Sequence, residues 1–293
     1  MNGILIVDKP QDWTSHDVVA KLRGFFGVRR IGHAGTLDPM ATGVLVVFVG
    51  RATRAVEFAQ ADSKEYIAGI KLGVTTDTQD VTGTVLCQRK SEVTREMMES
   101  AVKRFCGKIE QIPPMYSALK VNGKKLYEVA RKGGVVERKP REVEIGDIDI
   151  LEDTGDGFLL RVQCSKGTYI RTLCHDIGEY LGTGGVMSYL RRTKSGAFSL
   201  EDAVTLAQIQ QETENRERFL TPVDRLFFEY PRLDIDTDSE WRYRCGQKIS
   251  IPGVPEGMYR VYSGKTGEFL ALGEICQIVG EPILCLVKSF YTT

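Results

Sequence analysis

The sequence lacks the patterns that mark most metalloproteins, disulfide-rich proteins and membrane proteins. Its 293 residues contain three histidines and seven cysteines, and no two cysteines form a CxxC pair or stand at zinc-finger spacing from a histidine. The common zinc motifs and an even disulfide framework are therefore excluded. The sequence has no signal peptide and no apolar run of about 18 residues, the length that a membrane span needs. We expect a soluble cytoplasmic protein with reduced thiols and no metal site.

Nucleotide-binding loops and an excess of basic charge are also missing. Neither GxxxxGK[ST] nor GxGxxG occurs, and 39 basic residues balance 39 acidic ones. This argues against P-loop and dinucleotide enzymes. The charge is nevertheless uneven, because residues 120–141 hold eight basic side chains against Glu128 and Glu137. Such a run is commonly a solvated surface, but its glycines also suit a mobile arm that contacts phosphates.

One loop, residues 32–43, combines a carboxylate with constrained backbone. Asp38 precedes Pro39, which restricts the backbone of the residue before it, and glycines 32, 35 and 43 allow a close approach of other groups. The apolar run 44–49 follows at once and predicts a buried strand. Two interpretations remain open at this point: a carboxylate placed for chemistry, or a turn in which Asp38 caps neighbouring amides.

Hydrophobic periodicity predicts an α+β fold with a largely antiparallel sheet. Strands are expected at 3–8, 44–49, 65–72, 143–150 and 157–164, and helices from Thr14 to Gly27 and at 53–61, 94–106 and 168–181. Ser199 and Asp202 predict the start of a last helix. The elements do not alternate as βαβ units. After residues 227–231 short strands alternate with glycine turns, which predicts a small β-barrel-like module.

Eight segments in order resemble the TruB family of bacterial tRNA pseudouridine-55 synthases. They are 3–10, Thr14-Ser-His-Asp-Val-Val19, the loop 32–43, Lys64-Glu-Tyr66, 72–80, 113–120, Ser165-Lys-Gly-Thr-Tyr-Ile-Arg171 and Leu190-Arg-Arg192. The resemblance implies a pseudouridine synthase fold, a mixed and largely antiparallel sheet flanked by helices. Segments 246–249, 259–262 and 269–274 resemble a PUA domain, a small RNA-binding module.

The resemblance implies that the protein isomerises uridine to pseudouridine at position 55 in the T loop of tRNA. This reaction breaks the C1′–N1 bond, turns the uracil and joins C1′ to C5, so it needs no cofactor. It needs an ionised carboxylate, which adds to C1′, acts at C6 or removes a proton from C2′. The sequence leaves these three routes open. The family pattern gives the role to Asp38. Burial would raise the pKa of this carboxyl group, and a fixed arginine beside it would lower the pKa.

The family pattern also names the residues around Asp38. Arg171 is the implied cation, although spacing alone favours a surface ion pair. Tyr66 is the tyrosine that stacks on uracil, or by spacing a core aromatic. Leu190 packs against the base, and Asp80 belongs to the network near Arg171; their alternatives are core packing and turn capping. His33 matches the residue that enters the RNA loop, and its alternative is an ordinary turn or core position. Lys9 and Pro10 match a motif that supports the Asp38 loop.

The resemblance divides the chain into a catalytic domain, residues 1–228, and a PUA-like domain, residues 229–293. Within the first, residues 113–141 are the expected mobile RNA-binding insertion, with Lys120, Lys124 and Lys125 as phosphate contacts. The expected partner is the tRNA T stem-loop, with no membrane, no obligate protein partner and a monomeric chain. The alternatives are a non-catalytic RNA-binding or tRNA-folding protein and a guide-RNA-dependent pseudouridine synthase.

Overall fold

A computed structural model describes residues 1–293 except 60–62, 118, 122, 131–132, 279 and 292–293. In the main domain the strands are β1 (Gly3–Lys9), β2 (Ile31–Ala34), β3 (Thr42–Val49), β4 (Lys64–Leu72), β5 (Val74–Thr76), β6 (Val85–Gln88), β7 (Gly107–Gln111), β8 (Lys120–Val121), β9 (Lys124–Lys125), β10 (Arg141–Asp153), β11 (Gly157–Cys164), β12 (Gly185–Ser195) and β13 (Phe198–Ser199). Its helices are α1 (Ser15–Phe26), α2 (Val56–Ala59), α3 (Arg95–Arg104), α4 (Leu126–Ala130), α5 (Ile170–Tyr180) and α6 (Leu206–Gln211), with 3₁₀ helices η1 (Gly50–Ala55), η2 (Leu200–Asp202), η3 (Arg216–Phe219) and η4 (Val223–Phe227).

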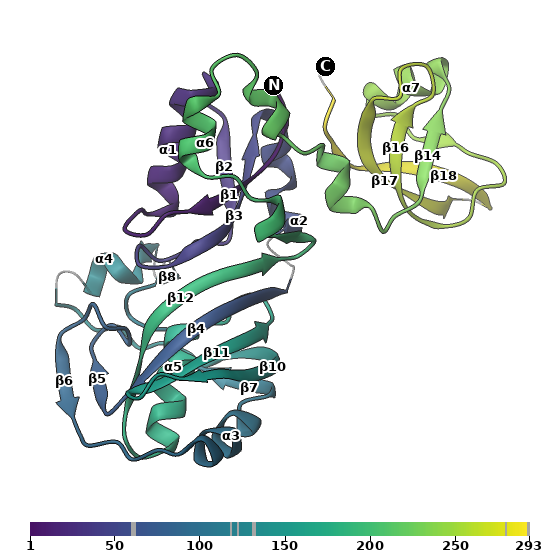
Figure 1. Ribbon diagram of the computed structural model, residues 1–293. Coiled ribbons are helices and arrows are strands. Elements are labelled where there is room, and N and C mark those ends of the chain that lie inside the picture. Colours follow the sequence, from purple (N-terminus) through teal and green to yellow (C-terminus); the bar gives the residue numbers. More distant parts are fainter. Residues whose placement is uncertain (60–62, 118, 122, 131–132, 279, 292–293) are drawn as a thin grey trace.

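One sheet of nine strands runs through the main domain in the order β1-β3-β12-β4-β11-β10-β7, with β2 on β3 and β13 on β12. All its pairings are antiparallel except the short β3–β12 pairing, where Arg191 lies opposite Thr42 and Arg192 opposite Gly43. Figure 1 shows that β12 joins two halves: β1, β2 and β3 with α1 above, and β4, β11 and β10 with α5 and α3 below. The predicted α+β class and antiparallel sheet are confirmed.

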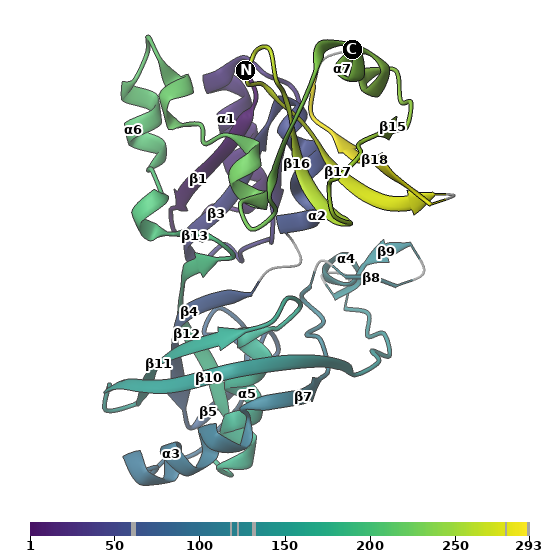
Figure 2. The same ribbon diagram turned by 90° about the vertical axis from the view of Figure 1, so that its right-hand side faces the viewer.

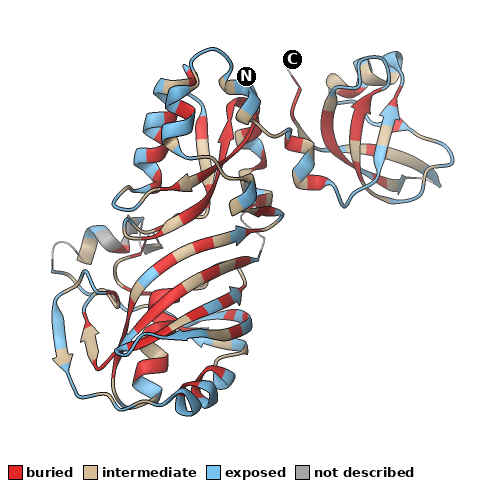
Figure 3. Cartoon of the chain, in the orientation of Figure 1, coloured by how far each residue is buried: buried red, intermediate tan, exposed pale blue. Residues whose placement is uncertain are grey.

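Each half of the sheet has its own core. The lower core gathers Ala68, Ile70 and Leu160 with Leu173 and Ile177 of α5. The upper half is covered on both faces, because strands β1 and β3 bury alternate side chains in two separate clusters. Figure 3 shows this burial as red running along the central strands, with pale blue on the loops and outer helical faces. The junction of the halves is therefore a place where two rigid cores meet.

Local capping signals explain the helix ends that the sequence predicts. Thr14 and Asp17 form a complete capping box on α1, and Gly27 ends the helix in the left-handed conformation at φ 63°. The segment predicted as a helix at 53–61 is helical over its described residues, as the end of the 3₁₀ helix η1 and the single turn of α2. The helix predicted after Ser199 is shorter than expected, because the Ser199–Asp202 box caps only the three residues of η2. A capping box satisfies the first turn of any helix but does not fix its length.

The C-terminal residues form a second sheet in the order β14-β16-β17-β18-β15. Its strands are β14 (Arg232–Ile235), β15 (Ile249–Ser250), β16 (Gly257–Ser263), β17 (Phe269–Ile278) and β18 (Glu281–Ser289). The small β-rich module is as expected, but it also contains a helix, α7 (Thr237–Arg244), whose Tyr243 is fully buried in the module core. Figure 2 shows this module beside α2 and the upper half of the main domain.

The module is fastened to the upper half by aromatic packing and by polar contacts. Phe227 of η4 meets Phe58 at a centroid distance of 5.1 Å, Phe290 at 5.8 Å and Phe269 at 6.2 Å. At the rim, Lys288 pairs with Glu57 at 2.6 Å. The two parts therefore share an apolar interface and not only a linker. Among helices built from the described residues, none has the length and apolar character needed to cross a membrane.

Candidate active site

A cleft of ≈1250 Å³ opens where the two halves of the main sheet meet. Residues from the β2–β3 loop, β4, the turn after β5, the segment before β8, the start of α5 and β12 line it, among them Thr36, Asp38, Lys64, Tyr66, Thr78, Asp80, Tyr116, Ser117, Thr168, Arg171, Leu190 and Arg192. A typical small-molecule pocket is about 300–1,000 Å³. The cleft is thus large enough for a nucleotide together with part of its polymer.

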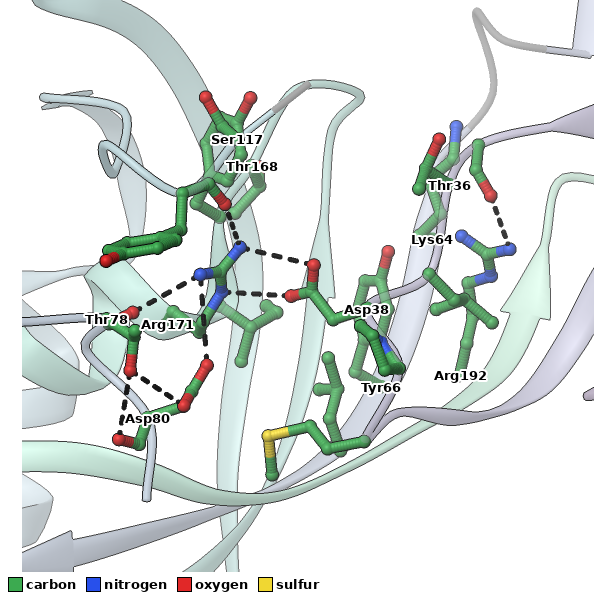
Figure 4. Close-up of a pocket in the computed structure, with 18 of the residues that line it drawn as sticks. Thr36, Asp38, Lys64, Tyr66, Thr78, Asp80, Ser117, Thr168, Arg171 and Arg192 are labelled. Carbon is green, nitrogen blue, oxygen red and sulfur yellow. Dashed lines mark hydrogen bonds and ion pairs between the residues drawn. The ribbon is translucent and has the colours of Figure 1, made fainter. Parts of the chain in front are cut away.

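A two-pronged ion pair joins the two walls of the cleft. Arg171 Nε lies 2.9 Å from Asp38 Oδ2, and Arg171 Nη2 donates to Asp38 Oδ1 at 3.2 Å (Figure 4). Asp38 belongs to the upper half and Arg171 to the first turn of α5 in the lower half. The pair is not a surface contact, because the Arg171 side chain is only 6% exposed. Side-by-side N–H···O bonds also fix the orientation of the carboxylate.

The remaining donors of Arg171 are held by the protein, which leaves the guanidinium no freedom to rotate. Its Nη2 also donates to the carbonyl of Tyr116 at 2.8 Å, and its Nη1 donates to the carbonyl of Thr78 at 3.2 Å. Tyr116 lies in the segment that leads into the basic residues 120–141. The base of the expected RNA-binding insertion thus touches the arginine that orients Asp38.

Asp38 is the side of the ion pair that faces the cleft. Its side chain is 35% exposed, and protein atoms surround the rest of it. This burial raises the pKa of the Asp38 carboxyl, the Arg171 charge and hydrogen bonds oppose the rise, and the Asp80 charge adds to it. The arrangement places a carboxylate with reduced hydration beside a fixed cation at the bottom of an open cleft, which suits a nucleophile or base.

Asp80 completes the charge cluster from the opposite side of Arg171. Its Oδ2 lies 3.8 Å from Arg171 Nη1, while its Oδ1 accepts from Thr78 Oγ1, Thr82 N and Thr82 Oγ1 at 2.6–2.9 Å. Asp80 therefore caps its own turn and also contributes negative charge near Arg171. The turn capping and the place beside Arg171 that the sequence offered as alternatives are therefore compatible in one carboxylate.

The backbone of the Asp38 loop is fixed by buried polar contacts. Lys9, 0% exposed, donates its Nζ to the carbonyls of Pro10 at 2.8 Å and Pro39 at 3.2 Å, and desolvation by burial lowers the pKa of Lys9 to about 8. The Ser15 hydroxyl accepts from Leu37 N at 2.9 Å. Gly43 has φ +99°, and a Cβ there would lie 2.2 Å from the carbonyl oxygen of Arg192. The loop can therefore hold Asp38 in one place.

Tyr66 and Leu190 are neighbours on adjacent strands and form the floor beside Asp38. Both line the cleft, although Tyr66 is only 8% and Leu190 6% exposed. Burial raises the pKa of the Tyr66 phenol, and the charge and hydrogen bonding of Arg192 lower it. Tyr66 is therefore a core aromatic that also borders the cleft, so the two interpretations of Tyr66 do not exclude each other.

His33, the residue predicted to enter the RNA loop, lies away from this cluster. His33 is in β2, is half-buried, and does not line the cleft; its ring packs edge-to-face on His16 at 5.4 Å, and His16 does line the cleft. Burial lowers the pKa of His33 to about 4, so this imidazole is neutral at pH 7. The side chains of Lys120, Lys124 and Lys125 lie outside the described residues.

Sequence analysis missed Arg192 and His16 as parts of the site. Arg192 is two residues after Leu190 in a strand, and residues at this spacing face the same side. The spacing from Leu190 could have identified Arg192 as a residue that faces the cleft. It was overlooked because two adjacent arginines are usually interpreted as surface residues. Among the described residues, no group of three or more His, Cys, Asp or Glu side chains is placed to hold a metal ion.

Comparison with known proteins identifies two family models along the main domain. The model of the TruB family pseudouridylate synthase N-terminal domain matches residues 23–170, and that of the tRNA pseudouridylate synthase B C-terminal domain matches residues 171–227. The first of these contains Asp38 and Tyr66, and the second begins at Arg171.

Curated relatives extend the similarity beyond the main domain. The tRNA pseudouridine synthase B of Pseudomonas syringae is 42% identical over 283 residues, covering 94% of this chain and 92% of the relative. That of Alkaliphilus oremlandii is 49% identical over 224 residues, covering 76% and 75%. Among solved structures, a Cbf5–Nop10–Gar1 complex contains a chain with TM-score 0.73 and 28% identity, covering 99% of this chain and 85% of that one.

Proposed function

Since the chain belongs to the TruB family of pseudouridylate synthases, we propose that it isomerises uridine to pseudouridine in tRNA, at position 55 of the T loop. The observation that carries this is the Asp38–Arg171 pair, which holds a carboxylate and a guanidinium together across the junction of the two halves of the main sheet. An isomerisation that imports no group needs such a carboxylate and little else.

Each residue of the cluster has a defined part in the proposed reaction. Asp38 adds to C1′, acts at uracil C6 or removes the C2′ proton. Arg171 keeps Asp38 ionised and oriented, and Asp80 belongs to the network around Arg171. Tyr66 and Leu190 contact the base. A stacked uridine has to leave its stack to reach Asp38 at the bottom of the cleft. The cleft therefore has to hold the flipped uridine together with the neighbouring part of the RNA, and its volume is large enough for both.

The alternatives differ in what they require of Asp38. A non-catalytic RNA-binding or tRNA-folding protein has no use for a desolvated carboxylate clamped by arginine. A guide-RNA-dependent synthase would need the same carboxylate, and a chain solved within a Cbf5–Nop10–Gar1 complex shares the fold. The curated relatives with 42–49% identity are named tRNA pseudouridine synthase B, and they favour direct recognition of tRNA.

We further propose how the rest of the molecule serves this reaction. Residues 1–228 form the catalytic domain, residues 113–141 form an insertion that closes on the T stem-loop, and residues 229–293 form an RNA-binding module. His33 enters the RNA loop from the side of His16, and Lys120, Lys124 and Lys125 contact phosphates. The protein works as a cytoplasmic monomer without an obligate protein partner.

The test is to incubate the protein with an unmodified tRNA transcript and to map pseudouridine by nucleotide. We expect one modified site, at position 55, and no product with a transcript that carries cytidine there. Asp38→Asn should lower the single-turnover rate by at least about a thousandfold, as for other essential nucleophiles, while tRNA binding persists. The matched control is Asp156→Asn, a surface carboxylate paired with Lys71, which should keep the wild-type rate. A turnover of Asp38→Asn within about tenfold of wild type would show that Asp38 is not the catalytic carboxylate.

A further inference from the structure

Arg171 is the second residue of α5 and therefore stands on the opening turn of this helix. Among the described residues of this turn, Tyr169 is the N-cap, and its side chain makes no capping hydrogen bond. The opening turn of a helix leaves backbone N–H groups without partners inside the helix, and helix ends fray. The arginine that orients Asp38 thus stands on a turn that its own N-cap side chain does not hold.

A buried glutamine from a distant strand anchors this turn instead. Gln111 Oε1 accepts from Tyr169 N at 3.0 Å, and Gln111 Nε2 donates to the Tyr169 carbonyl at 3.3 Å. The same carbonyl accepts from Leu173 N at 3.0 Å, which is the first backbone bond of the helix. One side-chain amide therefore pairs with both backbone groups of the residue at which α5 begins.

Gln111 is itself held by the main sheet. It is the last residue of β7 and lies opposite Arg141 in the β7–β10 pairing. The residue is only 1% exposed, so little water competes for its amide, and a buried amide without partners would be costly. The sheet therefore fixes the place where α5 starts, two residues before Arg171.

The two ends of the Arg171 side chain are held by different groups. The carbonyls of Tyr116 and Thr78 hold the guanidinium, while the position of its Cα is set by the first turn of α5. Misplacement of a group in an active site by about 1 Å can cost on the order of a hundredfold in rate. Loss of the Gln111 bonds would release the turn and loosen the contact of Arg171 with Asp38.

We propose that Gln111 is a positioning residue for the isomerisation: its amide fixes the first turn of α5 and thereby holds the Arg171 guanidinium in its two-pronged contact with Asp38. This inference rests on the proposed function, because it needs a reaction that depends on Asp38 as a carboxylate. It predicts that Gln111 acts through Arg171, and that it contributes to the rate and to the pH dependence of the reaction but not to tRNA affinity.

The first measurement compares Gln111→Met with wild type in the single-turnover rate at saturating tRNA and, separately, in tRNA affinity. Methionine is similar in size to glutamine and has no N–H group or amide oxygen to offer to Tyr169. We expect the rate to fall by about ten- to a hundredfold through misplacement of Arg171, with affinity within about threefold of wild type.

The pH profile separates this role from a purely structural one. Charged groups that act on Asp38 are Arg171, Asp80 and Lys9, and of these three only Arg171 stands on the turn that Gln111 holds. A displaced Arg171 opposes the raised pKa of Asp38 less, so this pKa should rise further. Because the proposed active form is the carboxylate, Gln111→Met should lose activity at a higher pH than wild type. With Arg171→Met already in place, Gln111→Met should change neither the rate nor the acid limb further.

An exposed glutamine is the matched control. Gln163 lies on β11, and its Nε2 donates to Glu65 Oε2 at 3.3 Å. Gln163→Met should therefore keep the wild-type rate and the wild-type acid limb.

An acid limb at the wild-type pH in Gln111→Met would overturn the proposal, even if the Tm is lower, because a purely structural glutamine would change stability alone. Losses that multiply in the double variant with Arg171→Met would also overturn it, and the acid limb decides where that variant is too slow to measure. If Gln111→Met does not fold, Gln111→Asn takes its place, since its shorter side chain cannot set the amide against both Tyr169 groups at once. A wild-type protein that forms no pseudouridine would instead refute the proposed function itself.

Discussion

Truncation of Phe227 should detach the C-terminal module from the catalytic domain without touching the active site. Phe227 is 3% exposed and contacts three other aromatic rings at centroid distances of 5.1–6.2 Å. Replacing a buried phenylalanine by alanine costs about 3–5 kcal/mol through lost burial and the cavity left behind. For a chain of this size about 1 kcal/mol corresponds to 2–4 °C, so Phe227→Ala should lower the Tm by about 6–20 °C.

The next residue provides the control, because Phe228 is 60% exposed and Phe228→Ala should change stability by about 0.5 kcal/mol or less. Thermal unfolding followed by circular dichroism compares the two variants. At a temperature where the main domain remains folded, Phe227→Ala should bind tRNA more weakly and keep its single-turnover rate at saturation, because no proposed catalytic residue lies in the module. Equal Tm values for the two variants would mean that the aromatic cluster does not hold the module in place.

Three further predictions concern the pKa of Asp38, the independence from metal ions and the contacts of basic side chains with RNA. Arg171→Met removes the positive charge that opposes the raised pKa of Asp38, so the pKa of Asp38 should rise further. The proposed active form of Asp38 is the carboxylate, and activity is lost as the pH falls through this pKa. The variant should therefore lose activity at a higher pH than wild type. The shift is measured from single-turnover rates as a function of pH, with each profile scaled to its own plateau. The surface variant Arg161→Met is the control. An acid limb at the same pH in Arg171→Met and wild type would contradict the prediction. Exhaustive treatment with EDTA should leave the rate unchanged in tRNA that stays folded, and a loss restored by zinc or magnesium would contradict this. Lys124 and Lys125 changed together to alanine should weaken binding and make its salt dependence shallower; an unchanged slope would show that they contact no phosphates.

The parts of the fold that the sequence predicts are those set by neighbouring residues. A capping box acts within four residues, and the alternation of buried side chains in β4 follows from the period of a strand, so Thr14, Asp17 and Tyr66 could be placed in advance. What a cap cannot state is how far the helix continues, since length depends on what the helix packs against. The helix expected after Ser199 is for that reason only the three residues of η2.

The active site depends on contacts between residues far apart in the chain. Asp38 and Arg171 are separated by 133 positions, and nothing in the residues around either one says that the two meet; the family resemblance supplied the pair, and the sheet order β3-β12-β4 brings it about. Tertiary contacts also give Arg191 and Arg192 different environments. The two have the same side chain and adjacent positions, yet the pleat of β12 turns one to Asp8 and the other to Tyr66 and the Asp38 loop. The identity of the side chain therefore does not decide which contacts it makes here; the alternation of the strand does.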